Sequence, residues 1–384
     1  MDTFAFIIHP IDPKRDVSRK FPLLGRVLNE RQIDFFSTFF PPVFISEIEG
    51  ITSQATGKEI KGWFIACPYT PRRMMELPER TVYRKIIQTG HVAEKLGAQI
   101  LGLGAFTSVV GDAGVTIASA LDVPVTTGDS YTVTVAVDSI REAACVMDIP
   151  LNKATAAVVG ATGAIGRVCA ELLSEDVERL YLIGRRQEAL EELRDQFKPR
   201  ARAELLVSTK MDVLANAQLI LTVTSAIHDI IRPEHLQPGS VVCDVARPRD
   251  VSAMVAAARD DILVIDGGMV DVPGPVDFHF NFGFPPGKAY ACMAETIALA
   301  LEGRFEDYTL GKHLTRERVK EVDAMARKHG FRLSGFRSFE QEVTPQHIET
   351  VRRNAKTARH LRAAHTYLEA AYGKSPPVSC RRRY

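Results

Sequence analysis

The pattern of apolar and polar positions changes near residue 154. From there to about residue 270, short apolar runs alternate with stretches of helical period. TAAVVG, RLYLIG, AELLVS, AQLILTVTS, SVVCDV and ILVIDGG predict buried strands, and AIGRVCAELL and QEALEELRDQF predict helices. Such alternation is typical of parallel βαβ units. We therefore predict an α/β fold with a Rossmann-like, doubly wound parallel sheet over 154–270.

Residues 1–153 mix strand and helix patterns less regularly. FAFIIH predicts a short strand, and VFISEIEGIT and EIKGWFIAC predict a hairpin around the polar SQATGK. PERTVYRKIIQTGHVAEKLGA has helical periodicity and a closing glycine. QILGLGAFTSVVG and VPVTTGDSYTVTVAVDSIREAACVM each start as a strand that enters a hydroxyl-rich loop, and the second continues as a helix. We expect 1–153 to form an N-terminal α/β substrate domain.

The remaining segment, 271–384, starts irregularly with GMVDVPGPVDFHFNFGFPPG and then becomes helical. One predicted helix carries Cys292, a second is LTRERVKEVDAMARKHG, and a third begins at Thr344-Pro345, with Thr as N-cap and Pro as first helical residue. We expect this segment to hold an active-site cysteine, followed by C-terminal helices and a basic tail.

Composition narrows the class of protein. A 46% hydrophobic and 25% charged content with a net charge of +1 is ordinary for a globular protein and predicts no nucleic-acid partner. The six cysteines are scattered without a C-x-x-C pair, so we expect neither a disulfide framework nor a metal site. No apolar run is long enough to span a membrane and no signal peptide is evident, which predicts a cytoplasmic protein.

A glycine-rich loop follows the first strand of the predicted Rossmann domain. VVGATGAIG has glycines in G-x-x-G-x-x-G spacing between a strand and a helix, which is the context that dinucleotide binding requires. A tight turn without a ligand is the alternative. The candidate cofactor-binding residues of this loop are Gly160, Thr162, Gly163, Ala164, Ile165 and Gly166.

The end of the second strand indicates which dinucleotide is bound. NAD-preferring sites place an acidic residue there to bind the ribose hydroxyls, but this chain has Arg185 and Arg186. Two guanidinium groups favour the 2′-phosphate of NADPH, whereas the alternative is that they only face solvent. Thr224 and Ser225, at the end of the fourth strand, are further cofactor candidates or simply strand-end capping residues.

Cys292 stands a few residues after Pro285-Pro286-Gly287, just inside a predicted helix. Lys288 lies four residues earlier, which on a helix is the same face. A helix N-terminus and a nearby cation both lower the pKa of a thiol, as a nucleophile requires. A cysteine among Ala, Met and Ile is, however, also compatible with a core position.

Other side chains are weaker candidates. Thr107 with Ser108, and the loop from Thr127 to Ser130, could donate to an oxyanion or cap helices, and His279 could donate a proton. Alternate phenylalanines in FHFNFGF, namely Phe278, Phe280, Phe282 and Phe284, could line an apolar channel or belong to the core.

Several of these motifs together resemble the long-chain acyl-[acyl-carrier-protein] reductases. They are AYACMAETIALALEG, VVGATGAIG, GAFTS, TTGDSYT and VIDGG, in the family's order over roughly 1–335. The resemblance implies NADPH-dependent reduction of a fatty acyl thioester to a fatty aldehyde. It places the nucleophile at Cys292, through an acyl-cysteine intermediate, and favours a site-lining role for the Thr107 and Ser130 loops. It also implies acyl carrier protein as the acyl donor and a downstream enzyme that consumes the aldehyde.

Three other functions remain open at this point. The donor could be acyl-CoA. The dinucleotide domain could instead belong to a shikimate- or glutamyl-tRNA-reductase-like oxidoreductase, of which a shikimate-type enzyme would not need Cys292. A non-enzymatic NADP(H) sensor is the third, and alkylation of Cys292 would leave its function intact.

The C-terminus beyond the resemblance is strongly basic. Residues 351–384 contain nine Lys or Arg and one Glu, so the near-neutral total charge hides a basic tail. Arg352, Lys356, Arg359 and Arg362 recur at helical spacing and form one stripe. The stripe could steer an acidic carrier protein, remain solvated, or make a weak contact with a membrane surface.

The arginines after the second strand make the cofactor preference testable. We expect at least about a tenfold higher kcat/KM with NADPH than with NADH. Arg185→Ala should lose most of that preference through a higher KM for NADPH, because the 2′-phosphate loses its cation. Steady-state kinetics with both cofactors measures this. Equal use of both cofactors by the unchanged protein would contradict the assignment.

Overall fold

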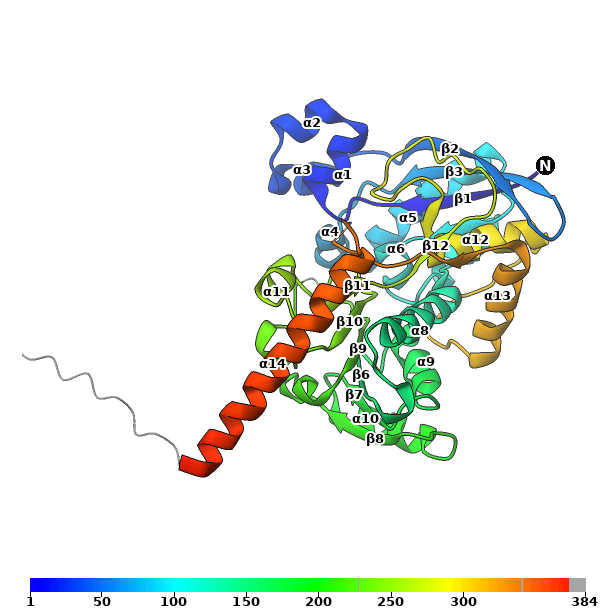
Figure 1. Ribbon diagram of the computed structural model, residues 1–384. Helices are drawn as coiled ribbons and strands as arrows, with labels where there is room; N and C mark the ends of the chain where they lie inside the picture. The colour runs from blue at the N-terminus through cyan, green and yellow to red at the C-terminus, as the bar shows by residue number, and fades with distance from the viewer. Residues whose placement is uncertain (227, 340, 373–384) are drawn as a thin grey trace, which may run out of the picture.

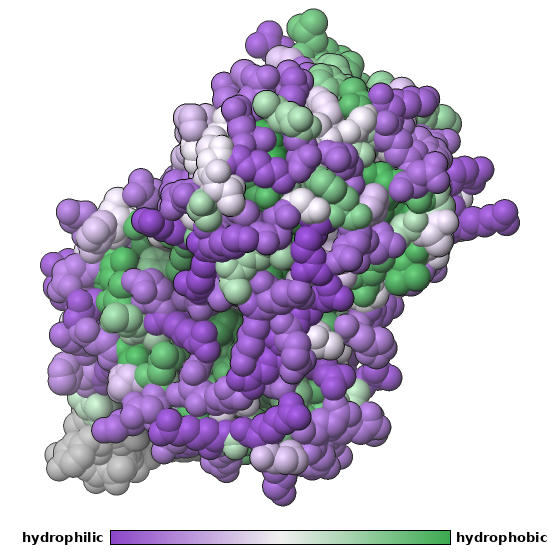
Figure 2. Space-filling model, turned by 90° about the vertical axis from the view of Figure 1, so that its right-hand side faces the viewer, coloured by the Kyte–Doolittle hydropathy of each residue, from purple (hydrophilic) through white to green (hydrophobic). Residues whose placement is uncertain are grey.

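Two helices packed against each other, α8 (Asp129–Val146) and α12 (Ala291–Glu302), separate two α/β sheets. In this computed structural model, which describes residues 1–226, 228–339 and 341–372, α12 packs on the N-terminal sheet. The other helix, α8, packs on the second sheet (Figure 1). The face of the molecule seen in Figure 2 is mostly polar, with apolar patches in both its upper and its lower part.

The first sheet has five strands in the order β2-β3-β1-β4-β5. Its strands β2 and β3 pair antiparallel, which confirms the predicted hairpin, and the other pairs are parallel. The strands are β1 (Asp2–Ile8), β2 (Val43–Thr52), β3 (Glu59–Ala66), β4 (Leu101–Leu103) and β5 (Val125–Thr126). The helices of this part are α1 (Pro13–Lys20), α2 (Pro22–Val27), α3 (Glu30–Ser37), α4 (Pro71–Glu76), α5 (Glu79–Leu96), α6 (Phe106–Val109) and α7 (Val115–Ala118).

The second sheet is parallel throughout, with six strands in the order β11-β10-β9-β6-β7-β8. This order is the doubly wound Rossmann arrangement and confirms the predicted fold class. The strands are β6 (Thr155–Val159), β7 (Arg179–Ile183), β8 (Glu204–Ser208), β9 (Leu219–Thr222), β10 (Val241–Asp244) and β11 (Leu263–Asp266). The helical segments are η1 (Leu151–Lys153), α9 (Ala164–Leu173), α10 (Gln187–Phe197), η2 (Asp212–Asn216), η3 (Pro233–His235) and α11 (Ala253–Ala258).

A small antiparallel sheet joins the two halves. Strand β12 (Met269–Asp271) pairs with β13 (Lys288–Tyr290) on one side and β14 (Arg332–Leu333) on the other. The chain continues from β13 directly into α12, so this sheet fixes where α12 begins. The remaining elements are α13 (Arg316–His329), β15 (Arg337–Ser338), β16 (Gln341–Glu342) and α14 (Pro345–Tyr372).

The last helix, α14, lies along the second half of the molecule (Figure 1). As predicted, its N-terminus is capped by Thr344, whose hydroxyl accepts the backbone N–H of His347 at 3.2 Å. Two members of the basic stripe contact the body: Arg352 forms an ion pair with Asp148, and Arg359 donates to the Pro238 carbonyl at 3.0 Å. The basic residues from Lys374 to Arg383 lie outside the described residues.

Candidate functional site

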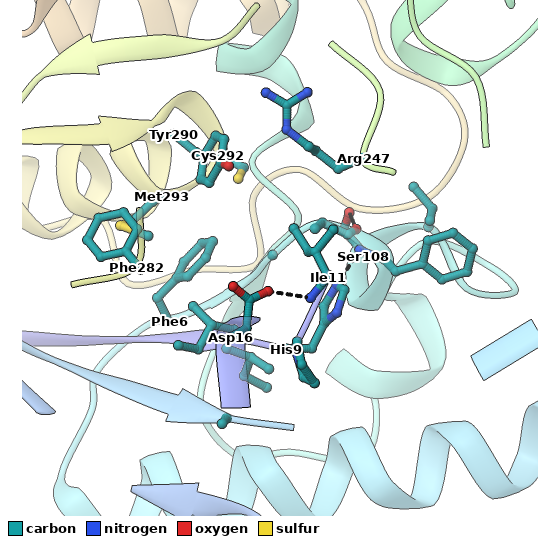
Figure 3. A pocket seen from close by; sticks show the side chains of 18 of the residues that line it. Phe6, His9, Ile11, Asp16, Ser108, Arg247, Phe282, Tyr290, Cys292 and Met293 are labelled. Atoms are coloured by element: carbon teal, nitrogen blue, oxygen red, sulfur yellow. Dashed lines mark hydrogen bonds between the residues drawn. The ribbon is translucent and has the colours of Figure 1, made fainter. Parts of the chain in front are cut away.

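A cavity of about 600 Å³ is lined by both halves of the molecule. One end is mainly apolar, with side chains from β1, α1 to α3 and the segment that carries Phe280 and Phe282. The other end is formed by the loop before α9 and by the carboxyl ends of the central strands of the second sheet. Cys292 lies on its wall, and Figure 3 shows its side chain near Tyr290 and Met293.

The glycine loop has the geometry of a phosphate cradle. Gly160 has a φ of +86°, and a Cβ at Gly166 would lie 2.2 Å from the Gly160 carbonyl oxygen, so neither position tolerates a side chain. Gly163 is the N-cap of α9 and provides no capping side chain, which leaves the first-turn N–H groups available to an anion. Gly163, Ala164 and Ile165 line the cavity. The cradle therefore fits a dinucleotide pyrophosphate.

Thr224 and Ser225 also line the cavity, at the end of β9. The Thr224 hydroxyl donates to Asp250 at 2.5 Å, and the same buried carboxylate accepts the Thr222 hydroxyl at 2.5 Å. Asp250 therefore fixes the loop that follows β9 where the strand order reverses. The sequence presented Thr224 either as a cofactor candidate or as a residue that caps the strand end. In the structure, Thr224 both lines the cavity and caps the end of β9 through its hydrogen bond with Asp250.

Arg185 and Arg186 follow β7, and both side chains are exposed. Thr162 is exposed on the glycine loop, and a Cβ at Gly184 would lie 3.5 Å from its hydroxyl oxygen. The end of β7 thus lies beside the glycine loop, where the adenosine ribose binds in Rossmann domains. These two arginines do not line the cavity itself.

The surroundings of Cys292 differ from those expected. It is the second residue of α12, and a Cβ at Gly128 (φ +74°) would lie 2.3 Å from the Cys292 Cα. Burial, followed by the charge of Asp129, raises the pKa of the thiol to about 12. Hydrogen bonds from the backbone of Ala105 and Met293 act in the opposite direction. The expectation of a lowered pKa is wrong, because desolvation outweighs the helix N-terminus and these amides.

Lys288 is not on the cysteine helix. It is the first residue of β13, and its ammonium group binds Ser334 and, at 2.9 Å, Asp271. The prediction that helical spacing places Lys288 beside Cys292 is therefore wrong, since helical spacing does not apply to an extended backbone. Lys288 does not line the cavity.

The hydroxyls of Thr107 and Ser130 are fully buried and engaged within the protein. Thr107 donates to the Gly104 carbonyl at 2.8 Å, and Ser130 accepts from the Thr309 hydroxyl at 2.9 Å. Neither residue lines the cavity, although their neighbours Ser108 and Asp129 do. The structure brings both predicted loops to the site, one through Ser108, which was also a sequence candidate, and the other through Asp129 of the loop at 127–130.

The phenylalanines of FHFNFGF and His279, which were the remaining sequence candidates, lie in different surroundings. Phe278 is buried and stacks on Phe64 with ring centroids 5.6 Å apart, whereas Phe280 and Phe282 line the cavity. The FHFNFGF segment is thus both core and channel wall. His279 is half exposed and lies beside Asp277 and Glu49, away from the cavity.

Two buried acids near Cys292 were not identified from the sequence. Burial, followed by the charge of Glu295, raises the pKa of Asp129 to about 7. Glu295 is fully buried and accepts the Thr126 hydroxyl at 2.6 Å and the Tyr131 N–H at 2.9 Å. It therefore ties α12 to the start of α8. The acidic residue in TTGDSYT was the available signal, but its burial depends on tertiary packing.

His9 is a further cavity residue that sequence reasoning missed. Its Nε2 accepts the backbone N–H of Phe106 at 2.9 Å, so the proton of the neutral ring resides on Nδ1. Among the described residues, the buried Nδ1 has no hydrogen-bond partner. Burial lowers the pKa of His9 to about 4, against a smaller effect of the Pro10 carbonyl, so the ring is neutral near pH 7.

One strained loop connects His9 to Cys292. Ala105 has a φ of +47°, which a non-glycine residue rarely adopts. Its backbone N–H is directed at the Cys292 sulfur, and the next N–H, of Phe106, is directed at His9. Two consecutive amides of one chain segment therefore bring the imidazole and the thiol to the same part of the cavity.

Comparison with known proteins identifies the family. The model of the shikimate / quinate 5-dehydrogenase family matches residues 142–266. The long-chain acyl-[acyl-carrier-protein] reductase of Synechococcus elongatus is 30% identical over 346 residues, which cover 85% of this chain and 98% of that protein. The chain belongs to this reductase family. It is accordingly an oxidoreductase, and its second sheet forms a domain for a nicotinamide cofactor.

Other relatives of this reductase homologue are larger or more distant. The aminotransferase PigE of a Serratia species is 33% identical over 311 residues, which cover 79% of this chain but 36% of PigE, so the chain spans about a third of that relative. Among solved structures, L-tryptophan dehydrogenase from Nostoc punctiforme matches 94% of this chain and 89% of its own with a TM-score of 0.39 and 12% identity. Glutamyl-tRNA reductase from Methanopyrus kandleri matches 61% and 46%, with a TM-score of 0.29 and 17% identity.

The raised pKa of Asp129 predicts a pH-dependent stability. Its folded pKa of about 7 lies above the ordinary 3.8, so its contribution is present below about pH 4 and is lost as the pH rises through 7. Asp129→Asn stays uncharged, and its free energy of unfolding should rise relative to the unchanged protein between pH 5 and 8, by at most about 3 kcal/mol, because about two pH units of the shift fall in this window. Urea unfolding at both pH values measures this.

The exposed Asp122 provides the matched control. Asp122→Asn should show no comparable change between the two pH values, because a solvated carboxylate has nearly the same environment in the folded and unfolded chain. If Asp129→Asn differs from the unchanged protein by the same amount at pH 5 and pH 8, the assignment of a raised pKa to Asp129 is wrong.

Proposed function

We propose that the protein reduces fatty acyl thioesters of acyl carrier protein to fatty aldehydes with NADPH, through an acyl group held on Cys292. The observation that carries this proposal is the position of Cys292. Its side chain opens into one cavity that contains both the glycine cradle and an apolar compartment. Membership of the reductase family supports the reaction class.

Residues of the second sheet would hold the cofactor. The amides at the start of α9 suit the pyrophosphate, and Thr224 and Ser225 face the space beyond it. The exposed guanidinium groups of Arg185 and Arg186 stand where a ribose phosphate would lie, which favours NADPH. When bound there, NADPH supplies the hydride that reduces the acyl carbon.

The acyl chain would occupy the apolar end of the cavity. Phe6, Phe280 and Phe282 lie on its wall together with aliphatic side chains from α1 to α3. Burial of methylene groups there stabilises a long chain in proportion to its length. The same walls exclude water from the thioester, which protects it from hydrolysis.

Formation of the acyl enzyme requires that Cys292 lose its proton during attack, because its free thiol is protonated at neutral pH. Asp129, with a pKa near neutrality, is the nearby group suited to accept that proton. The Cys292 sulfur then bonds to the acyl carbon while the bond from that carbon to the carrier sulfur breaks. Asp129 returns the proton to the departing thiolate, so charge and atoms balance.

His9 would stabilise the acyl oxygen. Its buried Nδ1–H lies beside the Pro10 carbonyl without a well-formed hydrogen bond, and the Ala105–Phe106 segment links the ring to the part of the cavity that holds the thiol. A neutral donor fixed in a water-poor cavity stabilises negative charge on an oxygen without itself losing a proton. After reduction, the negatively charged oxygen re-forms the carbonyl while the bond between the acyl carbon and the Cys292 sulfur breaks. The departing thiolate takes up one proton from solvent, so the aldehyde leaves and the Cys292 thiol is restored.

The surface charge of α14 bears on the acyl donor, and the properties of the aldehyde bear on the enzyme that would receive it. An acidic carrier protein suits the exposed Arg353 and Lys356 on α14, whereas acyl-CoA remains the alternative thioester. A long-chain aldehyde is reactive and poorly soluble, so an enzyme that consumes it is the expected next partner.

Intact-mass measurement tests the covalent step. Incubation with palmitoyl-carrier protein without NADPH should add one acyl group to the unchanged protein and none to Cys292→Ala, because only the nucleophile is removed. Cys145→Ala, which removes an exposed thiol, should still acquire the acyl group. An adduct on Cys292→Ala, or aldehyde production by it, would refute the mechanism. A parallel incubation with palmitoyl-CoA distinguishes the two donors.

Two substitutions of His9 separate catalysis from folding. His9→Gln places an oxygen near the former Nε2, which keeps the bond from Phe106 but removes the Nδ1 donor, whereas His9→Asn keeps a donor near Nδ1 and loses that bond. We expect His9→Gln to lower kcat by roughly 100-fold with little change in Tm. His9→Asn should lower Tm and retain more of kcat. If kcat instead follows Tm in both variants, His9 has only a structural role.

A further inference from the structure

Large apolar side chains are exposed mainly in one part of the protein. Of the fifteen such side chains in the described residues, nine fall between Phe21 and Phe44. We call residues 13–44, which contain α1 to α3 and the following loop, the apolar cap. Its most exposed members are Val27 at 77%, Leu23 at 74% and Phe39 at 71%. Concentrated exposure of this kind indicates a surface that binds another apolar surface.

The cap is continuous with the mouth of the cavity. Phe21, Leu24, Phe36 and Phe40 are each exposed to solvent and also line the cavity. Figure 1 shows α1 to α3 standing out from the N-terminal sheet. An apolar path therefore leads from the acyl compartment to the outer surface of the cap.

The charges of the cap favour an anionic partner. Its two inward acids, Asp16 and Asp34, pair with Arg19 and Arg73 at 2.8 and 3.1 Å. Glu30 is the one acid of the cap that is classed as exposed, whereas five basic residues are exposed. These are Lys14, Arg15, Lys20, Arg26 and Arg31.

Apolar side chains surrounded by basic ones are the pattern of an interfacial membrane contact. None of the helices of the described residues is long and apolar enough to cross a bilayer, so the contact would be peripheral. We propose that the apolar cap docks on the surface of a membrane that contains anionic lipids. The side chains of Leu23, Val27 and Phe39 insert between the headgroups, and the basic residues contact lipid phosphates.

An acidic carrier protein or a second copy of this chain suits the cap less well. Recognition of a carrier protein through charge requires few buried apolar side chains, yet three on this surface are more than 70% exposed. These three are distributed over α2 and the loop after α3, which matches a broad fluid surface. The docking itself does not depend on the reaction, and only its use for release of the aldehyde into lipid rests on the proposed function.

Vesicle flotation tests the docking with the full chain. Vesicles of phosphatidylcholine with about 30% phosphatidylglycerol should carry the unchanged protein to the top of the gradient, and pure phosphatidylcholine should carry less. Leu23→Glu/Val27→Glu should reduce the bound fraction by roughly tenfold or more, because charges replace the inserted side chains. Arg26→Glu/Arg31→Glu should lose the preference for anionic vesicles. All variants keep the basic tail, so a loss is due to the cap.

Met254→Glu is the matched control, since Met254 is 75% exposed on α11 and far from the cap in sequence. This variant should bind vesicles as the unchanged protein does. Every variant should have the same Tm as the unchanged protein. Equal binding by Leu23→Glu/Val27→Glu, or no binding by the unchanged protein, overturns the proposal. So does a higher KM of this variant for acyl carrier protein without lipid, which indicates a carrier site. A smaller oligomer of this variant than of the unchanged protein in size-exclusion chromatography also overturns it, because that result indicates a contact between copies. Cys292→Ala should still bind, which separates docking from the reaction.

Discussion

The contact between Gly128 and the first turn of α12 is the constraint on which the site depends. A Cβ at Gly128 would lie 2.5 Å from the Cys292 Cβ, so only a glycine lets the start of α8 approach Cys292 this closely. Glu295 holds the same two segments together one turn later, through Thr126 and Tyr131. Because α8 packs on the cofactor sheet and α12 on the other, this junction sets the position of the thiol relative to both.

Burial acts in one direction on four titratable groups in and around the site. Burial raises the pKa values of Cys292, Asp129 and Glu295 and lowers that of His9, so each is shifted toward its neutral form. In such surroundings, charge that develops during a reaction interacts strongly with fixed donors, since few water molecules screen it.

Sequence reasoning was accurate where structure is determined locally. The predicted helices AIGRVCAELL and QEALEELRDQF coincide with α9 and α10, because their apolar period and the preceding glycine loop or strand end define them. It failed at Lys288, where pairing of β13 with β12, seventeen residues away along the chain, overrides the local pattern. His9 could not be recognised at all, since its role depends on a contact with Phe106, 97 residues later. Cys292 and the glycine loop could be proposed as site candidates from the sequence, because each lies in a contiguous motif.

The raised pKa of Cys292 has a consequence for the chemical durability of the protein. Oxidants and electrophiles in a cell react with thiolates, and a thiol with a pKa of about 12 presents almost none of that form at neutral pH. Conversion to sulfenic acid is correspondingly slow while no acyl group is present. In the proposed reaction, the nucleophile would thus stay unreactive between turnovers, and would react only when a substrate fills the cavity and supplies the electrophilic carbon.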